Sequence, residues 1–130
     1  MTIVIGFTPE PASAQALERG LAEAGLRGED VLLVNATKGD AFVDTRYGQQ
    51  GDIARVREQL EASGLAFEIS QPMGPDIADL VLDEAERVGA SLIVIGLRHR
   101  TPVGKLLLGS TAQRILLDAT CPVLAVKPPR

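Results

Sequence analysis

Residues 92–111, LIVIGLRHRTPVGKLLLGST, join three sequence patterns. The first four residues form a continuous aliphatic run, which is typical of a strand buried on both faces of a parallel sheet. Gly96 ends this run, and a basic loop follows it. Gly109 and Ser110 then mark the start of a helix. This stretch predicts a parallel strand that leads through a loop into a helix.

Three more runs of the same aliphatic kind lie elsewhere in the chain, at residues 2–5, 31–34 and 123–126. Leu65, Phe67 and Ile69 instead alternate with Ala66, Glu68 and Ser70. Alternation favours a strand with one less buried face, at an edge of the sheet. The sequence therefore predicts five strands.

Helical periodicity separates these strands. Pro75 is expected at the first position of the third helix, with Asp76 and Asp79 in its first turn and Gly89 at its end. The fourth helix is expected over residues 110–119. The predicted apolar faces of the four helices are Ala14, Leu17, Leu21 and Ala24; Ile53, Val56 and Leu60; Ile77, Val81 and Val88; and Ala112, Ile115 and Leu116.

The order βαβαβαβαβ predicts one α/β domain over residues 1–130, an open twisted parallel sheet with helices on both faces. Ligands of such folds lie beyond the carboxyl ends of the strands, near the point where the strand order reverses. Function is therefore expected in the loops after the first, second and fourth strands, at residues 6–10, 35–47 and 96–108.

Composition excludes several classes of protein. With 130 residues, 45% of them hydrophobic, the chain is neither disordered nor a disulfide scaffold, and its one cysteine, Cys121, is expected to pack. A net charge of −4 and 3% aromatic residues argue against nucleic acid or anionic lipid as partner. The short apolar N-terminal run matches neither a signal peptide nor a membrane span, so a cytoplasmic location is expected.

Charge is unevenly distributed along the chain. No acidic residue lies between Arg87 and Asp118, whereas Arg98, Arg100, Lys105 and Arg114 are basic. The helix start at residues 109–111 adds backbone N–H groups and two hydroxyls, so the segment predicts an anion site, with phosphate as the anion. A plainer interpretation stays open: the glycines serve a turn and a helix start, Ser110 is an ordinary N-cap, and the basic run with His99 is a solvated loop.

Two common phosphate-binding motifs do not match. A P-loop would need Gly at His99 and Ser or Thr at Leu106. The dinucleotide fingerprint is missing after the first strand, where Gly6 is followed by Phe7 and Thr8. Neither P-loop hydrolysis nor NAD chemistry is supported, and no catalytic or metal-binding residue is predicted.

The spacing around the basic loop resembles that of the universal stress proteins. Nucleotide-binding members of that family carry Gly, two residues, Gly, nine residues, then Gly-Ser or Gly-Thr. This chain has Gly96, two residues, His99, nine residues, then Gly109-Ser110. The resemblance extends to the Thr8-Pro9-Glu10 turn and to the closing residues 119–126, ATCPVLAV, and so covers the whole chain.

The resemblance implies a five-stranded sheet in the order 3-2-1-4-5, of the adenine nucleotide alpha hydrolase-like fold. It also implies a homodimer and, in one branch of the family, bound ATP, with or without Mg²⁺. Adenine would lie against Val34 and Asn35, and the ribose beside Phe7 and Thr8. The full set of predicted nucleotide-binding residues is Phe7, Thr8, Val34, Asn35, Gly96, Leu97, Arg98, Arg100, Lys105, Gly109, Ser110 and Thr111.

Two positions depart from the ATP-binding pattern. Gly6 stands where that pattern has Asp at the end of the first strand, and His99 replaces the second Gly of the motif. Two functions are therefore predicted. The first is a stress-response protein that binds an adenine nucleotide and is at most a slow ATPase. The alternative is a dimeric scaffold that binds no ATP and acts through protein contacts.

The last strand carries the prediction of a dimer. In the order 3-2-1-4-5 the apolar run Val123–Val126 lies on an edge of the sheet, with no charge until Lys127. Soluble proteins rarely leave such an edge bare. Pairing with the same strand of a second copy about a two-fold axis would cover it.

Overall fold

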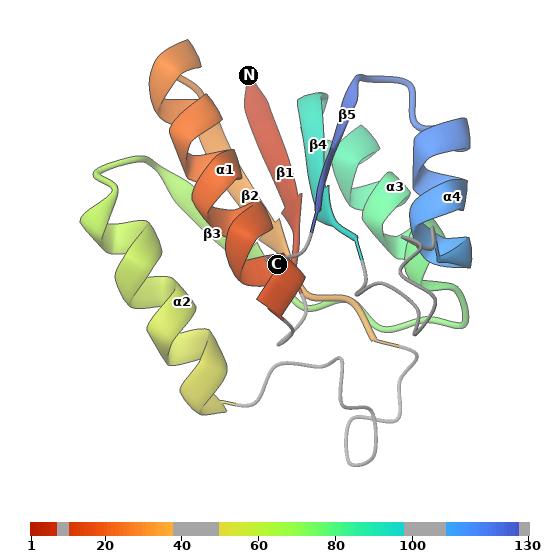
Figure 1. Ribbon diagram of the computed structural model, residues 1–130, viewed down its shortest axis with the longest axis horizontal. Helices are drawn as coiled ribbons and strands as arrows, with labels where there is room; N and C mark the ends of the chain where they lie inside the picture. The colour runs from red at the N-terminus through yellow and green to blue at the C-terminus, as the bar shows by residue number, and fades with distance from the viewer. Residues whose placement is uncertain (8–10, 38–49, 98–108, 128–130) are drawn as a thin grey trace.

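The computed structural model describes residues 1–7, 11–37, 50–97 and 109–127 of the chain. Strands and helices alternate along these residues (Figure 1), in the predicted order. The strands are β1 (Thr2–Gly6), β2 (Asp30–Val34), β3 (Phe67–Ser70), β4 (Ala90–Gly96) and β5 (Val123–Val126). The helices are α1 (Pro11–Arg27), α2 (Gln50–Ala62), α3 (Ile77–Val88) and α4 (Ser110–Asp118).

The strands form one parallel sheet in the order β3-β2-β1-β4-β5, which confirms the predicted fold. The central strand, β1, pairs with β2 on one side and with β4 on the other. The alternating segment forms β3 at one edge of the sheet, also as predicted, although Leu65 precedes the strand. At the other edge lies β5, whose four residues are all half-buried.

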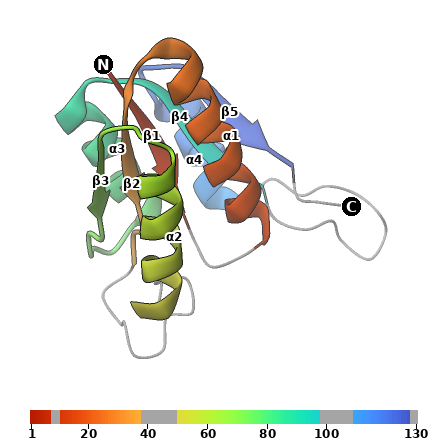
Figure 2. The ribbon, with the colours of Figure 1, turned by 90° about the vertical axis from the view of Figure 1, so that its left-hand side faces the viewer.

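Side chains of the central strands alternate between two apolar cores. Ile3 and Ile5 of β1 pack in the core under α1 and α2, whereas Val4 packs in the core under α3 and α4. Both views of the ribbon place α1 and α2 on one side of the sheet and α3 and α4 on the other (Figures 1 and 2). Because both faces are covered, the buried strands show continuous aliphatic runs in the sequence.

Two predicted inward residues face outward. Ala14 of α1 is exposed, and the buried face of that helix uses Ser13 and Ala16 beside Leu17. Leu116 of α4 is also exposed, because the next residue along a helix is rotated by about 100° from its neighbour. Ile115 is the buried residue of this nine-residue helix. Because Ile115 points into the core, the residue after it points away from the core.

The start of α3 differs from the prediction by two residues. The helix begins at Ile77, and Asp76 is its N-cap rather than a residue of the first turn, so Pro75 lies outside the helix. Asp76 has extended backbone angles, and its Oδ1 accepts a hydrogen bond from the Asp79 N–H at 3.2 Å. A carboxylate that satisfies a first-turn donor in this way fixes where the helix begins. Gly89, with φ of 61°, ends the helix as predicted.

The strand order reverses beside β1, whose two neighbours continue the chain in opposite directions across the sheet. Backbone hydrogen bonds extend past the ends of the strands: the Phe7 N–H donates to the Val34 carbonyl, and the Leu97 N–H donates to the Val126 carbonyl, both at 2.8 Å. The carboxyl ends of β1, β2 and β4 therefore meet at one edge. This is where such folds place ligands.

Candidate functional site

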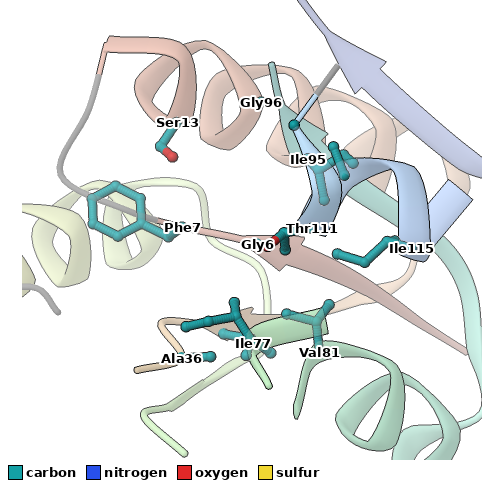
Figure 3. A pocket seen from close by; sticks show the side chains of 13 residues that line it. Gly6, Phe7, Ser13, Ala36, Ile77, Val81, Ile95, Gly96, Thr111 and Ile115 are labelled. Carbon is teal, nitrogen blue, oxygen red and sulfur yellow. The ribbon is translucent and has the colours of Figure 1, made fainter. Parts of the chain in front are cut away.

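A cavity of about 120 Å³ opens at the carboxyl end of the sheet. The strand ends supply one part of its lining, and residues of α1, α3 and α4 with the N-cap of α4 supply the rest (Figure 3). The lining residues are Gly6, Phe7, Ser13, Val34, Ala36, Ile77, Val81, Ile95, Gly96, Gly109, Thr111, Ala112 and Ile115.

Most of the cavity wall is apolar. Figure 3 shows Phe7 and Ser13 on the left of the cavity, Ile77 and Val81 of α3 at the bottom and Ile115 of α4 on the right. Ligand sites commonly have apolar walls with a few polar groups that fix orientation. Sites for drug-sized ligands usually measure about 300–1,000 Å³, so this cavity has room for one ring of a ligand rather than for a whole nucleotide.

The N-terminus of α4 forms the polar part of the lining. Gly109 is the N-cap, with φ of −65° and ψ of 159°, and no side chain caps the helix at this position. The first turn carries no acidic residue, and Thr111 also lines the cavity. First-turn N–H groups lack partners within a helix, and together with the helix dipole they attract an anion.

The structure brings five of the predicted binding residues to the cavity: Phe7, Val34, Gly96, Gly109 and Thr111. Three others are described but lie outside its lining, namely Asn35, Leu97 and Ser110. The remaining four, Thr8, Arg98, Arg100 and Lys105, lie outside the described residues, as does His99. The basic half of the predicted phosphate site is thus not part of the structure described.

Asn35 has a structural role at the end of β2. Its side chain is fully buried, and its Nδ2 donates a hydrogen bond to the Phe7 carbonyl at 2.9 Å. Its Oδ1 accepts a hydrogen bond from the Gln71 Nε2 at 3.1 Å. The amide therefore holds the ends of β1 and β2 together and positions the Phe7 backbone beside the cavity.

Sequence reasoning missed the contribution of aliphatic side chains from α3 and α4. Ile77, Val81 and Ile115 were expected on inward helix faces, but not in a ligand site. Their aliphatic type and helical spacing are the same for a closed core as for a cavity wall. The one available signal was position, because the first turns of α3 and α4 follow strands β3 and β4 at the carboxyl end of the sheet.

One ion-pair network joins α3 to α4 beside the cavity. Arg114 Nη1 donates to Asp76 Oδ2 at 2.9 Å, and its Nε donates to Asp118 Oδ2 at 3.0 Å. Its Nη2 donates to Asp79 Oδ1. The hydrogen bond to Asp79 is the largest cause that raises the pKa of Arg114 above its ordinary value, followed by that to Asp118, so the guanidinium stays charged.

A second cavity, of about 190 Å³, lies at the opposite end of the sheet, between the last turn of α3, the start of β4 and the turn before β5. It is the larger of the two, but it lies away from the strand ends where ligands of this fold bind. Cys121 lines it, and burial raises the pKa of this thiol. A thiol that stays protonated is a poor nucleophile, which favours packing over redox chemistry.

In residues 1–7, 11–37, 50–97 and 109–127, no group of three or more His, Cys, Asp and Glu side chains is arranged to hold a metal ion. None of the helices described there has both the length and the apolar character needed to cross a membrane.

The open parallel sheet in the order 3-2-1-4-5, with a cavity where the strand order reverses, and the likeness to solved structures described below place the chain among α/β proteins of the adenine nucleotide alpha hydrolase-like fold. Within that class, a model of the universal stress protein family matches residues 1–127. A universal stress protein of Mycolicibacterium smegmatis is 49% identical over 126 residues, which cover 97% of each chain. The chain belongs to the universal stress protein family, as the resemblance in its sequence predicted.

Solved structures agree with this assignment. A universal stress protein from Archaeoglobus fulgidus has a TM-score of 0.83 at 29% identity, with 98% of each chain covered. The structure of the universal stress protein from Archaeoglobus fulgidus in complex with dAMP has a TM-score of 0.69 at 26% identity, also with 98% of each chain covered.

Proposed function

We propose that this protein is a stress-response protein that binds an adenine nucleotide, with ATP as the leading candidate, at the carboxyl end of its sheet. The observation that carries the proposal is the start of α4, where a helix N-terminus without a side-chain cap opens onto an apolar cavity. The cavity suits a flat ring, and the helix start suits a phosphate. These two chemistries occur together in a nucleotide.

A relative supports this choice of ligand. The Archaeoglobus fulgidus protein, 26% identical to this chain, is described in complex with dAMP. On the proposed pose the base lies between Val34 and the walls from α3 and α4, and the phosphates extend out of the cavity past its polar part at Gly109 and Thr111. Thr8, Arg98, Arg100 and Lys105 stay predicted phosphate or ribose contacts. We expect any bound Mg²⁺ to enter the site together with the ATP.

We infer that the protein acts by binding rather than by catalysis, with at most slow hydrolysis of ATP, and that it works in the cytoplasm. The strand β5 supports a homodimer, because its half-buried residues 123–126 lie at an edge of the sheet and pair with β4 on one side. The free edge of an apolar strand can pair with the same strand of a second copy.

The alternative function, a scaffold that binds no nucleotide, is favoured by one observation. Gly6 ends β1 at the cavity, where the ATP-binding pattern of the family has Asp. A Cβ at this position would lie 3.3 Å from Ile95 Cγ2, so the strand end is closely backed by β4. Without a carboxylate there, the chain departs from that pattern by one charged group at the cavity.

The substitution Gly109→Val separates the two functions. The backbone angles of Gly109 are open to valine, so the new side chain crowds the start of α4 without straining the chain. In a thermal unfolding series with millimolar ATP and Mg²⁺, the wild type is expected to gain several degrees in Tm, and Gly109→Val to gain none. Gly25→Val is the matched control, because a Cβ at Gly25 of α1 has no neighbour within 4 Å.

Each outcome decides something. No shift in the wild type would overturn nucleotide binding and favour the scaffold. A shift retained in Gly109→Val would overturn the proposed phosphate position. All three proteins are expected to sediment as dimers, and a monomer at micromolar concentration would overturn the proposed role of β5.

A further inference from the structure

Arg114 of α4 binds three carboxylates from two helices with three different nitrogen atoms. The partners on α3 are Asp76, its N-cap, and Asp79, in its first turn. The third partner, Asp118, lies one turn further along α4 itself. The guanidinium is planar and its donors have fixed directions, so three simultaneous contacts define the position of one helix relative to the other.

The residues of this network alternate with residues that line the cavity. On α3, Asp76 precedes Ile77, and Asp79 lies two residues before Val81. On α4, Arg114 lies directly before Ile115. The helix turns that hold the ion pairs on their outer side therefore supply the cavity wall on their inner side. A change in the separation of α3 and α4 changes the width of the cavity.

We propose that Arg114 is a positioning residue, which sets the separation of α3 and α4 and thereby the fit of a flat ring in the cavity between them. Arg114 is not among the residues that line the cavity, so its role requires no contact with the ligand. It acts through Asp76 and Asp79, which fix the first turn of α3 and with it Ile77. The effect on the helices depends on the network alone, whereas the effect on affinity rests on the nucleotide binding proposed above.

Asp76 links the network to the helix start. Its Oδ1 accepts the capping hydrogen bond from the Asp79 N–H, while its Oδ2 accepts the hydrogen bond from Arg114. Removal of the guanidinium leaves Asp76 and Asp79 as neighbouring negative charges, which repel each other and weaken the cap. The first turn of α3 is therefore where the loss of Arg114 is expected to appear.

Arg87 provides a matched control. It also binds two carboxylates, Glu84 on its own helix and Glu68 on β3, with nitrogen to oxygen distances of 2.7 and 3.1 Å. Its side chain is 49% exposed, against 42% for Arg114. It lies in the last turn of α3, away from the residues that line the cavity. Because exposed ion pairs contribute little to stability, both substitutions should change Tm by only a few degrees.

The experiment compares Arg114→Met, Arg87→Met and Arg114→Lys in the full chain. Hydrogen exchange of the ligand-free proteins is expected to be faster in Arg114→Met than in Arg87→Met at the amides of Asp79 and Leu80, which donate to the side chain and the carbonyl of Asp76. Calorimetric titration with ATP and Mg²⁺ is expected to show Kd raised on the order of tenfold in Arg114→Met and unchanged in Arg87→Met. Lysine keeps the charge but not the fork, so Arg114→Lys should recover only part of the affinity.

Equal exchange at the start of α3 in all variants would overturn the positioning role, whatever the ligand does. Unchanged exchange with weakened binding would show that Arg114 acts on the ligand directly, which also contradicts it. A wild type that binds no ATP would overturn the proposed function, and the exchange data would still decide whether Arg114 fixes the two helices.

Discussion

The two faces of the sheet differ in how closely the helices approach the strands. On the face of α1, a Cβ built on Gly20 would lie 2.5 Å from Ile5 Cδ1, so this helix rests directly on β1. On the face of α3 and α4, the core opens into a cavity lined by Val34, Ile95 and Ile115. The α1 face is closely packed where Gly20 meets Ile5 and reaches the cavity at Phe7 and Ser13, whereas the face of α3 and α4 gives up packing at its carboxyl end and leaves a space for a ligand.

The largest effect on stability is expected from substitutions at two residues of equal burial, one on each face of the sheet. Leu17 of α1 and Ile115 of α4 are both 2% exposed, but only Ile115 borders the cavity. Leu17→Ala is expected to cost about 4–5 kcal/mol of unfolding free energy, and Ile115→Ala about 2–3 kcal/mol, because a side chain beside a void loses fewer contacts. Denaturant unfolding measures both. Equal losses would mean that the two faces are packed alike.

The next test concerns close approach on the α1 face. Gly20→Ala gains about 1 kcal/mol from helix propensity, but its Cβ would lie 2.5 and 2.7 Å from Ile5 Cδ1 and Cγ1. Overpacking of this kind costs about 1–3 kcal/mol, so a net loss of stability is expected. Ile5→Ala removes both clashing atoms, and a double-mutant cycle should show that the two changes together cost less than their sum. A strictly additive cycle would place the cost elsewhere.

Much of the fold could be predicted from sequence because both faces of the sheet are covered. Residues 31–34 and 92–95 are buried on each side, so the sequence shows them as unbroken aliphatic runs. The strand order came from the resemblance to a family. The first error concerns the start of α3, which is set by the carboxylate of Asp76 rather than by Pro75. The second concerns Ala14, because the small side chains around it leave the apolar face of α1 ambiguous in the sequence.

The site was predictable only in part. Gly96 and Gly109 are visible in the sequence because a spacing motif contains them, and both line the cavity. Ile77 and Val81 were invisible as site residues, because an aliphatic residue in a wall has the same pattern as one in a closed core. Asn35 shows the opposite problem, since an amide at a strand end looks like a ligand contact but is buried and holds two strand ends together.

The smallest effect is expected at the glycine of the open face. A Cβ on Gly6 would lie 3.3 Å from Ile95 Cγ2, against 2.5 Å for the closest atom at Gly20, and Ile95 borders the cavity into which it can move. Alanine also restricts the unfolded chain, a gain of about 0.4–1 kcal/mol that offsets a minor contact. Gly6→Ala should therefore leave the unfolding free energy within about 1 kcal/mol of the wild type, whereas Gly20→Ala lowers it. The opposite outcome in chemical unfolding is that Gly6→Ala costs as much unfolding free energy as Gly20→Ala. In that case Ile95 in the cavity wall moves no more easily than Ile5 in the closed core, and the two faces differ in shape but not in how far their side chains can shift.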